Sequence, residues 1–307
     1  MGNHNINAEE IALYDRQIRL WGFNAQQALK QSRVLLITAS PLANEIAKNL
    51  VLSGIGKLCV LDSMTVYEKD VEEQFFIEAS DIGQLRANVF KKKLHELNPL
   101  VEIDTDTSLI SEIDEGKISK FSMVIATQLD YEEFCRINEL TRICNASFYA
   151  TSCFGLYGFA FCDLINHNFA IDRVVDNTKV EEDMFIVQKP MKEAFQSILG
   201  ETLKPRLAKK IPTLYPAMLS LLKSKKSDPD SIRQVCIEQK LNEKTVLNGE
   251  FLSKFSSNIS FQWTPVMSVV GGVVSQDALN SISKKQFPID NFWIFDAESG
   301  LAPIYRL

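Results

Sequence analysis

The stretch RVLLITASPLANEIAKNLVLSGIGKLCVLD, residues 33–62, decides the fold. It begins with a short apolar run rich in branched side chains, residues 33–38, which is typical of a buried parallel strand. Residues 42–53 follow with apolar positions on one face of a helix, and Gly54 and Gly56 close that helix. A second apolar strand, residues 57–62, ends in an acid. This strand–helix–strand unit predicts the entry of a doubly wound α/β sheet.

The same alternation continues along the chain and predicts a mostly parallel sheet. A further helix precedes the unit, at residues 8–20. Residues 155–164 alternate in hydrophobicity, which favours an antiparallel strand. The remaining periodic segments predict helices at residues 86–97 and 131–144 and strands at residues 101–104, 121–127 and 147–151.

Residues 172–258 differ in character from the rest. They are rich in lysine and glutamate with helical spacing, and we expect an inserted helical subdomain there. The apolar α/β character then returns with a buried helix at residues 265–283 and a closing hairpin at residues 291–296 and 302–306. The predicted organisation is therefore an α/β domain, residues 8–171 and 259–307, interrupted by residues 172–258.

Composition narrows the class of protein. The chain has 307 residues and a formal net charge of -6, a balance that argues against a nucleic-acid binder. None of its six cysteines forms a CxxC pair, so we expect no zinc site of the usual spacing. No apolar run approaches the roughly 20 residues that cross a bilayer, and we expect no membrane contact. The polar N-terminus predicts no signal peptide and a reducing compartment.

The loop between the first strand and its helix, TASPLANE at residues 38–45, contains no glycine. In nucleotide-binding units, glycines at this point let the backbone approach the phosphates. Here Ser40 is a good N-cap and Pro41 suits the first helical position. Because Pro41 lacks an N–H and Ser40 satisfies another, the loop is predicted to close on itself. The residues alone leave open whether it ever descended from a phosphate site.

Four segments in this order carry a resemblance to a known family. They are YDRQIRLWG at residues 14–22, NEIAKNLVLSG at residues 44–54 with Asp62 beyond it, DIGQLRA at residues 81–87 leading to Leu97-Asn98-Pro99, and PVMSVVGG at residues 265–272. Together they resemble the activating enzymes of ubiquitin-like proteins. The resemblance implies a Rossmann-like adenylation domain of the ThiF/MoeB type. In length the chain is similar to the small, non-catalytic subunits of heterodimers that activate SUMO.

The resemblance also implies that this half has lost its own ATP site. The phosphate-loop glycines of the family fall on Thr38, Pro41 and Ala43. The nucleotide-contacting Asn-Arg pair of an active half falls on Glu72 and Glu73, and two carboxylates would repel a triphosphate. No cofactor is therefore expected in this chain, and ATP and magnesium are assigned to the partner subunit.

Two acids at family positions remain, and we interpret both as structural. Asp62 stands where the family places a ribose-type acid, and Asp130 where an active half has an aspartate near magnesium. For Asp130 the sequence favours a capping box with Glu133 at the start of the next helix. Asp62 alone does not make an ATP site.

Arg16 is the one residue for which the resemblance implies a catalytic role. In the family, the Tyr-Asp-Arg helix of the silent half supplies an arginine to the ATP site of its partner, and that position is Arg16. Arg19 is expected to form a surface pair with Asp15 or with the helix end. No cysteine is assigned as a thioester nucleophile, because Cys236, the one within residues 172–258, falls on a predicted amphipathic helix.

The resulting hypothesis is an obligate heterodimer. The expected partners are the catalytic large subunit, SUMO and, through the complex, the SUMO-conjugating enzyme, and the family implies residence in the nucleus, with the cytoplasm as a second location. A self-sufficient homodimeric ThiF/MoeB-like enzyme and a regulatory subunit for another ubiquitin-like modifier remain alternatives. A nicotinamide-dependent oxidoreductase and a scaffold without a chemical role are weaker ones.

Overall fold

The structure is a computed structural model that describes residue 6 and residues 8–175 and 178–307. Its centre is an eight-stranded sheet with the strand order β10-β9-β6-β5-β4-β1-β2-β3. The five strands from β5 to β3 run parallel, while β6, β9 and β10 join them as antiparallel neighbours. The bounds are β1 Arg33–Ile37, β2 Lys57–Leu61, β3 Glu102–Asp106, β4 Met123–Thr127, β5 Ser147–Phe154, β6 Tyr157–Asp163, β9 Phe292–Asp296 and β10 Ile304–Tyr305.

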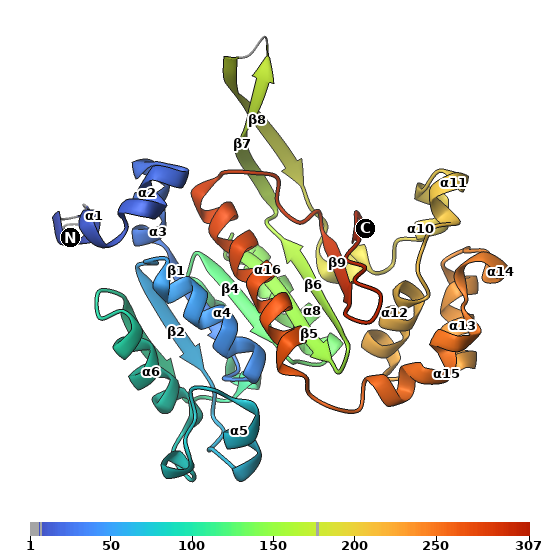
Figure 1. The fold of residues 1–307 in the computed structure, drawn as a ribbon, viewed down its shortest axis with the longest axis horizontal. Coiled ribbons are helices and arrows are strands. Elements are labelled where there is room, and N and C mark those ends of the chain that lie inside the picture. The colour runs from blue at the N-terminus through green and yellow to red at the C-terminus, as the bar shows by residue number, and fades with distance from the viewer. Residues whose placement is uncertain (1–5, 7, 176–177) are drawn as a thin grey trace.

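Both faces of the sheet are covered, as the continuous apolar strands require. Alternate side chains of β1 enter two different cores: Val34 and Leu36 lie in one, and Leu35 and Ile37 in the other. In Figure 1, α4 and α16 cross the face turned to the viewer. The helices contributing to that core are α3 Phe23–Gln31, α4 Pro41–Leu52, α5 Glu68–Glu73, α6 Arg86–Leu97 and α16 Thr264–Ser283.

The predicted α/β architecture is confirmed, including the buried helix α16 and the closing pair β9–β10. The N-terminal helix differs from the prediction, because it is broken at Tyr14 into α1 Ala8–Leu13 and α2 Asp15–Trp21. None of the helices in the described part of the chain is both long and apolar enough to cross a membrane. Short elements complete this half of the fold: η1 Ala79–Asp81, η2 Ile110–Glu112 and α7 Glu115–Ile118.

The helical prediction for residues 172–187 is wrong. Strands β7 Asn166–Val175 and β8 Thr178–Val187 form an antiparallel hairpin instead, and the proposed boundary at residue 172 falls inside β7. Figure 1 shows this arm projecting away from the sheet. A projecting arm meets solvent on much of its surface, so it tolerates a charged composition that is also typical of a helix surface.

The helical part of the insertion begins at Met191, and it packs on the sheet rather than around a separate core. Phe195 and Tyr215 are almost fully buried, and their ring centroids lie 4.9 and 6.3 Å from that of Phe292 in β9. All of the insertion helices except α11, which has no buried residue, therefore contribute to the core that α8 Tyr131–Ile143 shares. The insertion helices are α9 Met191–Ala194, α10 Leu199–Thr202, α11 Pro205–Ala208, α12 Leu214–Ser224, α13 Pro229–Glu238, α14 Glu243–Val246 and α15 Gly249–Asn258.

Candidate functional site

The carboxyl ends of β1, β2 and β4 meet at one edge of the sheet, where open α/β sheets bind their ligands. A hollow of about 530 Å³ lies there. Its lining combines the loop after β1 with the start of α6 and the start of α8. The residues include Thr38, Asp62, Ser63, Arg86, Gln128, Asp130 and Glu133. The topology therefore keeps the nucleotide position of the fold, and the side chains decide what can occupy it.

Thr38 keeps a glycine-like backbone in the loop after β1. Its φ is 70°, a left-handed conformation that glycine adopts freely and β-branched residues rarely do. The Thr38 hydroxyl lies 2.9 Å from the carbonyl oxygen of Thr127, to which it donates, and 2.6 Å from the Thr127 hydroxyl. This backbone geometry fits the placement of Thr38 at a family glycine. The hydroxyl contacts hold the loop against β4.

The loop also uses its own amides, as predicted. Ser40 is the N-cap of α4, and its Oγ accepts a hydrogen bond from Ala43 N at 3.1 Å. Pro41 occupies the first helical turn and has no N–H. Ala39 N donates to the Asp62 carboxylate at 2.7 Å. The amides of Ala39 and Ala43 are therefore bonded within the chain, and Pro41 has no amide N–H to offer. None of these three positions can donate a hydrogen bond to an anion.

Asp62 is held by the protein itself. Besides Ala39 N, its carboxylate accepts from Met64 N at 2.7 Å and from Arg86 Nη2 at 2.9 Å. Arg86 also reaches Asp70 of α5 at 3.3 Å. An acid that would hydrogen-bond a ribose is therefore neutralised and occupied. The sequence analysis did not identify Arg86 as a site residue. Arg86 lies in the quoted segment DIGQLRA, and a positive charge within a family motif was the signal that could have pointed to it.

The remaining acids do not gather at the hollow. Glu72 and Glu73 lie on α5 outside the residues that line it, so a direct repulsion of phosphates by these two carboxylates is not seen in the geometry. Asp130 does line the hollow and stands at the N-cap of α8, but the predicted capping box is wrong, because its side chain makes no cap hydrogen bond. It pairs with Lys225 at 2.8 Å instead.

Arg16 lies elsewhere. It is an exposed residue of α2, and within the described part of the chain it makes no hydrogen bond or ion pair. Helix α2 reaches the body of the protein near Gly54, at the amino end of β2, where Gln17 Nε2 donates to Leu52 O at 3.4 Å. The predicted surface pair is confirmed: Arg19 and Asp15 lie 2.9 Å apart. Arg16 therefore stays away from this chain's own hollow and remains available to another molecule.

The cysteines offer no reactive thiolate. Five are buried and Cys144 is half-buried. Burial raises the pKa of Cys236 to about 11 and that of Cys59 to about 11, and it also raises the pKa of Cys144. A thioester nucleophile needs the opposite shift. The described residues contain no cluster of histidine, cysteine and acidic side chains suited to a metal ion.

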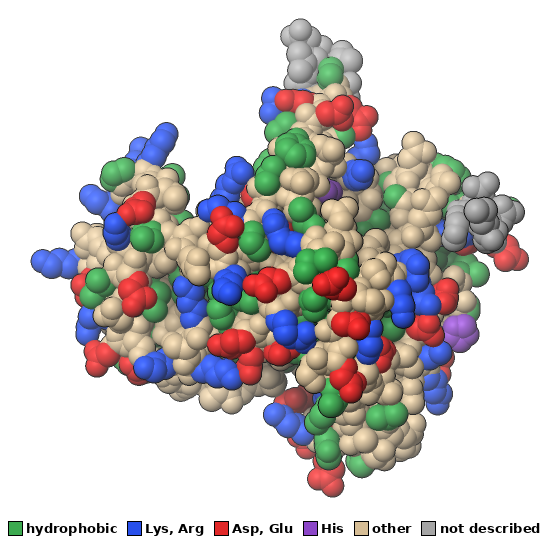
Figure 2. Space-filling view, turned by 180° about the vertical axis from the view of Figure 1, so that it is seen from behind, with side chains coloured by type: hydrophobic (Ala, Val, Ile, Leu, Met, Phe, Trp, Pro, Cys, Tyr) green, Lys and Arg blue, Asp and Glu red, His purple; other side chains and the backbone are tan. Residues whose placement is uncertain are grey.

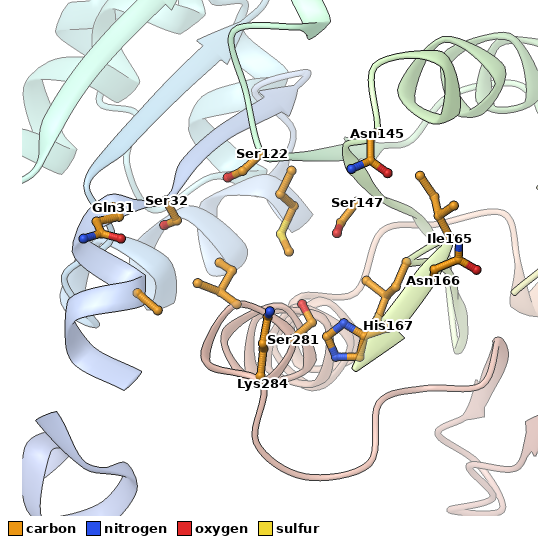
Figure 3. Close-up of a pocket in the computed structure, with 14 residues that line it drawn as sticks. Gln31, Ser32, Ser122, Asn145, Ser147, Ile165, Asn166, His167, Ser281 and Lys284 are labelled. Carbon is orange, nitrogen blue, oxygen red and sulfur yellow. The ribbon is translucent and has the colours of Figure 1, made fainter. Parts of the chain in front are cut away.

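A second hollow, of about 350 Å³, lies at the opposite edge of the sheet. Figure 3 shows His167, Ser281 and Lys284 at one side of it and Ser122 and Ser147 at the other. Helices α3, α8 and α16 all end beside this hollow, and helix C-termini disfavour an anion. Burial and the Lys284 charge lower the pKa of His167 to about 4. The geometry therefore does not suggest a phosphate site here.

The surface carries charge of both signs. In Figure 2, lysine and arginine side chains are interspersed with aspartate and glutamate over the face seen from behind. That face shows no broad basic patch of the kind that phosphate backbones attract.

Comparison with known proteins agrees with this architecture. The chain is 31% identical over 96% of its length to SUMO-activating enzyme subunit 1 of Xenopus tropicalis, of which it covers 94%. It is 31% identical over 98% of its length to the DNA damage tolerance protein RHC31 of Saccharomyces cerevisiae, covering 98%. The crystal structure of SeMet PaaA superposes with a TM-score of 0.63 at 15% identity, over 99% of this chain and 76% of that one, which supports the fold. Residues 14–306 match the ThiF family, and the chain belongs to that family.

Proposed function

We propose that this chain is the small, non-catalytic subunit of a heterodimeric SUMO-activating enzyme. The partner subunit holds ATP, magnesium and the thioester cysteine, and this chain completes the partner's ATP site with Arg16. The complex then passes SUMO to a conjugating enzyme, in the nucleus. The likeness to SUMO-activating subunits along nearly the whole chain supports the choice of modifier.

One observation carries the proposal. The polar groups at the nucleotide edge are occupied by this chain's own bonds, chiefly those of Asp62 with Ala39 N and Arg86, whereas Arg16 stands exposed on a different part of the surface. Residues that would have to bind ATP are already bonded to each other, so they do not fit the nucleotide. An arginine without a partner among the described residues fits a site on another chain.

The chemistry gives Arg16 a defined task. Adenylation joins the C-terminal carboxylate of the modifier to the α-phosphate of ATP and expels pyrophosphate, so negative charge grows on the departing phosphates. A guanidinium presents several N–H donors in a planar fork and stays charged at any working pH. Placed in a dry site, such a donor stabilises the transition state more than the ground state. Thioester formation on the partner's cysteine follows.

The decisive experiment compares Arg16→Ala with Arg19→Ala in the reconstituted heterodimer. Both residues are exposed on α2, so general damage to the helix would affect the two variants alike. We expect Arg16→Ala to slow SUMO-dependent ATP–pyrophosphate exchange by about a hundredfold and Arg19→Ala to change it less than about twofold. Size-exclusion chromatography should show intact heterodimers for both. Equal rates in the two variants would reduce this chain to a scaffold.

A second measurement separates the heterodimer from a self-sufficient enzyme. The purified chain alone, supplied with ATP, magnesium and SUMO, is expected to show no ATP–pyrophosphate exchange above background. Rapid exchange by the chain alone would place ATP in its own hollow and refute the proposal. Offering ubiquitin in place of SUMO to the reconstituted pair tests the choice of modifier.

A further inference from the structure

We infer that Tyr14, Gly54 and Asn98 form a single anchor that positions Arg16 for catalysis in the partner's site. The inference rests on the proposed function for the role of Arg16, and on the structure for the anchor. These three residues belong to three separate segments of the chain, each singled out by its sequence. The fold brings them to one point beside α2.

Helix α2 needs an anchor because its own side chains contribute almost no buried surface. None of its seven residues is buried. Tyr14, directly before the helix, is 4% exposed and so provides a fully inserted side chain two residues from Arg16. At the other end, Trp21 is half-buried and donates from Nε1 to Gln26 at 3.2 Å. The position of Arg16 is therefore governed mainly by how Tyr14 is seated.

Gly54 makes the seat for the Tyr14 ring. It has a φ of +78°, and a Cβ built on it would lie 2.5 Å from Tyr14 Cζ and 2.7 Å from the Tyr14 hydroxyl oxygen. Atoms do not approach so closely, so any side chain here would push the ring outward. The absence of a side chain at residue 54 is thus a condition for docking α2 in its present place.

Asn98 fixes the far end of the ring. Its Nδ2 donates to the Tyr14 hydroxyl at 2.7 Å and to Val51 O at 2.8 Å, and its Oδ1 accepts from Leu100 N at 3.2 Å. Asn98 is 3% exposed, so these bonds are shielded from water and orient the amide firmly. The phenol is therefore held at its tip as well as along its face.

The test uses Gly54→Ala with Gly300→Ala as its matched control. Gly300 also has a positive φ, +69°, but a Cβ there would meet no atom within 4 Å. The control therefore carries similar backbone strain without the clash. We expect Gly54→Ala to speed amide hydrogen exchange in α2 about tenfold and to slow adenylation in the heterodimer about tenfold or more, since misplacement by about 1 Å costs up to a hundredfold. Gly300→Ala should do neither.

Tyr14→Phe provides a milder variant in case Gly54→Ala folds poorly. It keeps the ring and removes the Asn98 bond, and we expect effects in the same direction of about threefold. Adenylation rates of double variants that also carry Arg16→Ala separate a positioning role from a general effect on stability. In that background, Gly54→Ala or Tyr14→Phe should slow adenylation less than about twofold further, because the group being positioned is gone.

The outcomes distinguish the two proposals. If Arg16→Ala leaves adenylation unchanged, the proposed function fails. If Arg16→Ala slows adenylation while Gly54→Ala loosens α2 without slowing it, the anchor is structural and this inference is overturned. Unchanged exchange in α2 with Gly54→Ala would also overturn it, and so would fully additive effects of the two substitutions.

Discussion

At the scale of single residues, Arg86 links two acids at the nucleotide edge of the sheet. Its side chain is 19% exposed, and its guanidinium pairs with Asp62, whose side chain is 2% exposed, and Asp70, whose side chain is 12% exposed. Buried ion pairs add little net stability, but removal of one partner leaves an uncompensated charge. The network therefore makes Arg86 costly to replace.

We expect Arg86→Met to lower the free energy of unfolding by about 3 kcal/mol, because Asp62 and Asp70 would keep buried charges without a cation. Urea denaturation measures this. Arg19→Ala is the control, since it breaks an exposed arginine–aspartate pair and should cost less than about 1 kcal/mol. A similar small loss in both variants would show that water, rather than Arg86, compensates the two acids.

His167 predicts a pH dependence of stability. Its pKa falls from 6.5 to about 4 in the folded chain, so between these values the unfolded chain binds a proton that the native one does not. Stability is then present above pH 6.5 and is lost as the pH drops towards 4, by about 3 kcal/mol.

Comparison of wild type with His167→Leu isolates this contribution. Asp277, whose pKa burial raises to about 6, acts with the opposite sign and is present in both proteins. The variant should lose about 3 kcal/mol less than wild type between pH 6.5 and pH 4. A direct check is the NMR titration of the imidazole, and an unshifted midpoint near 6.5 would contradict the prediction.

At the scale of elements, the β7–β8 arm is clamped near its base, and its described residues further out have fewer contacts with the rest of the chain, such as the ion pair of Glu181 with Lys285. Ala170 N donates to Lys284 O at 3.0 Å, and Gln286 N donates to Ala170 O at 3.1 Å. His167 stacks on Phe169, whose ring meets Phe287 edge-on. Beyond these contacts the described residues of the two strands pair mainly with each other, and an isolated hairpin is only marginally stable in water.

We therefore expect a gradient of amide protection along the arm. The pair Arg173–Val180 lies beyond the clamp, and the pair Asn166–Val187 lies at the base. Exchange of the ladder amides near Arg173 should be at least about tenfold faster than near Asn166. Amides in the central strand β5 serve as the slow reference. Uniform protection along the arm would mean that a contact outside the chain, such as a partner, supports its outer part.

At the scale of the whole molecule, the helices from Met191 to Asn258 and the sheet share one core. Phe292 is fully buried in β9 and contacts Phe195 and Tyr215 of the insertion. A segment that shares its core with the sheet has little stability of its own, so the two are expected to unfold together.

Phe292→Ala tests this cooperation. It should lower the free energy of unfolding by about 3 to 5 kcal/mol, and hydrogen exchange should accelerate by the same factor in α12 and in β6. The matched comparison is Phe287→Ala, because residue Phe287 is 53% exposed. Two separate thermal transitions, or acceleration confined to α12, would show an independently folding subdomain.

Local sequence determined much of the fold. The apolar runs at β1, β2 and β4 predict strands that are buried on both faces. The periodicity of α4 and α16 predicts the helices that cover them. These predictions need only the local pattern, because it shows which side chains must leave water. The same holds for the cap at Ser40, since N-capping involves neighbours within three residues. The family motifs likewise singled out Arg16 and the loop after β1 as candidates.

Tertiary structure decided the rest, because those contacts join distant parts of the chain. The charge pattern of residues 172–187 suits a helix surface and an exposed arm equally. Asp130 had a local partner available, yet it pairs with Lys225 nearly a hundred positions away. The bonding of Asp62 to Arg86 and the seating of Tyr14 between Gly54 and Asn98 depend on side chains that meet only once the sheet has formed. The sequence alone therefore identified candidate residues, whereas the tertiary structure determined which of them are in contact.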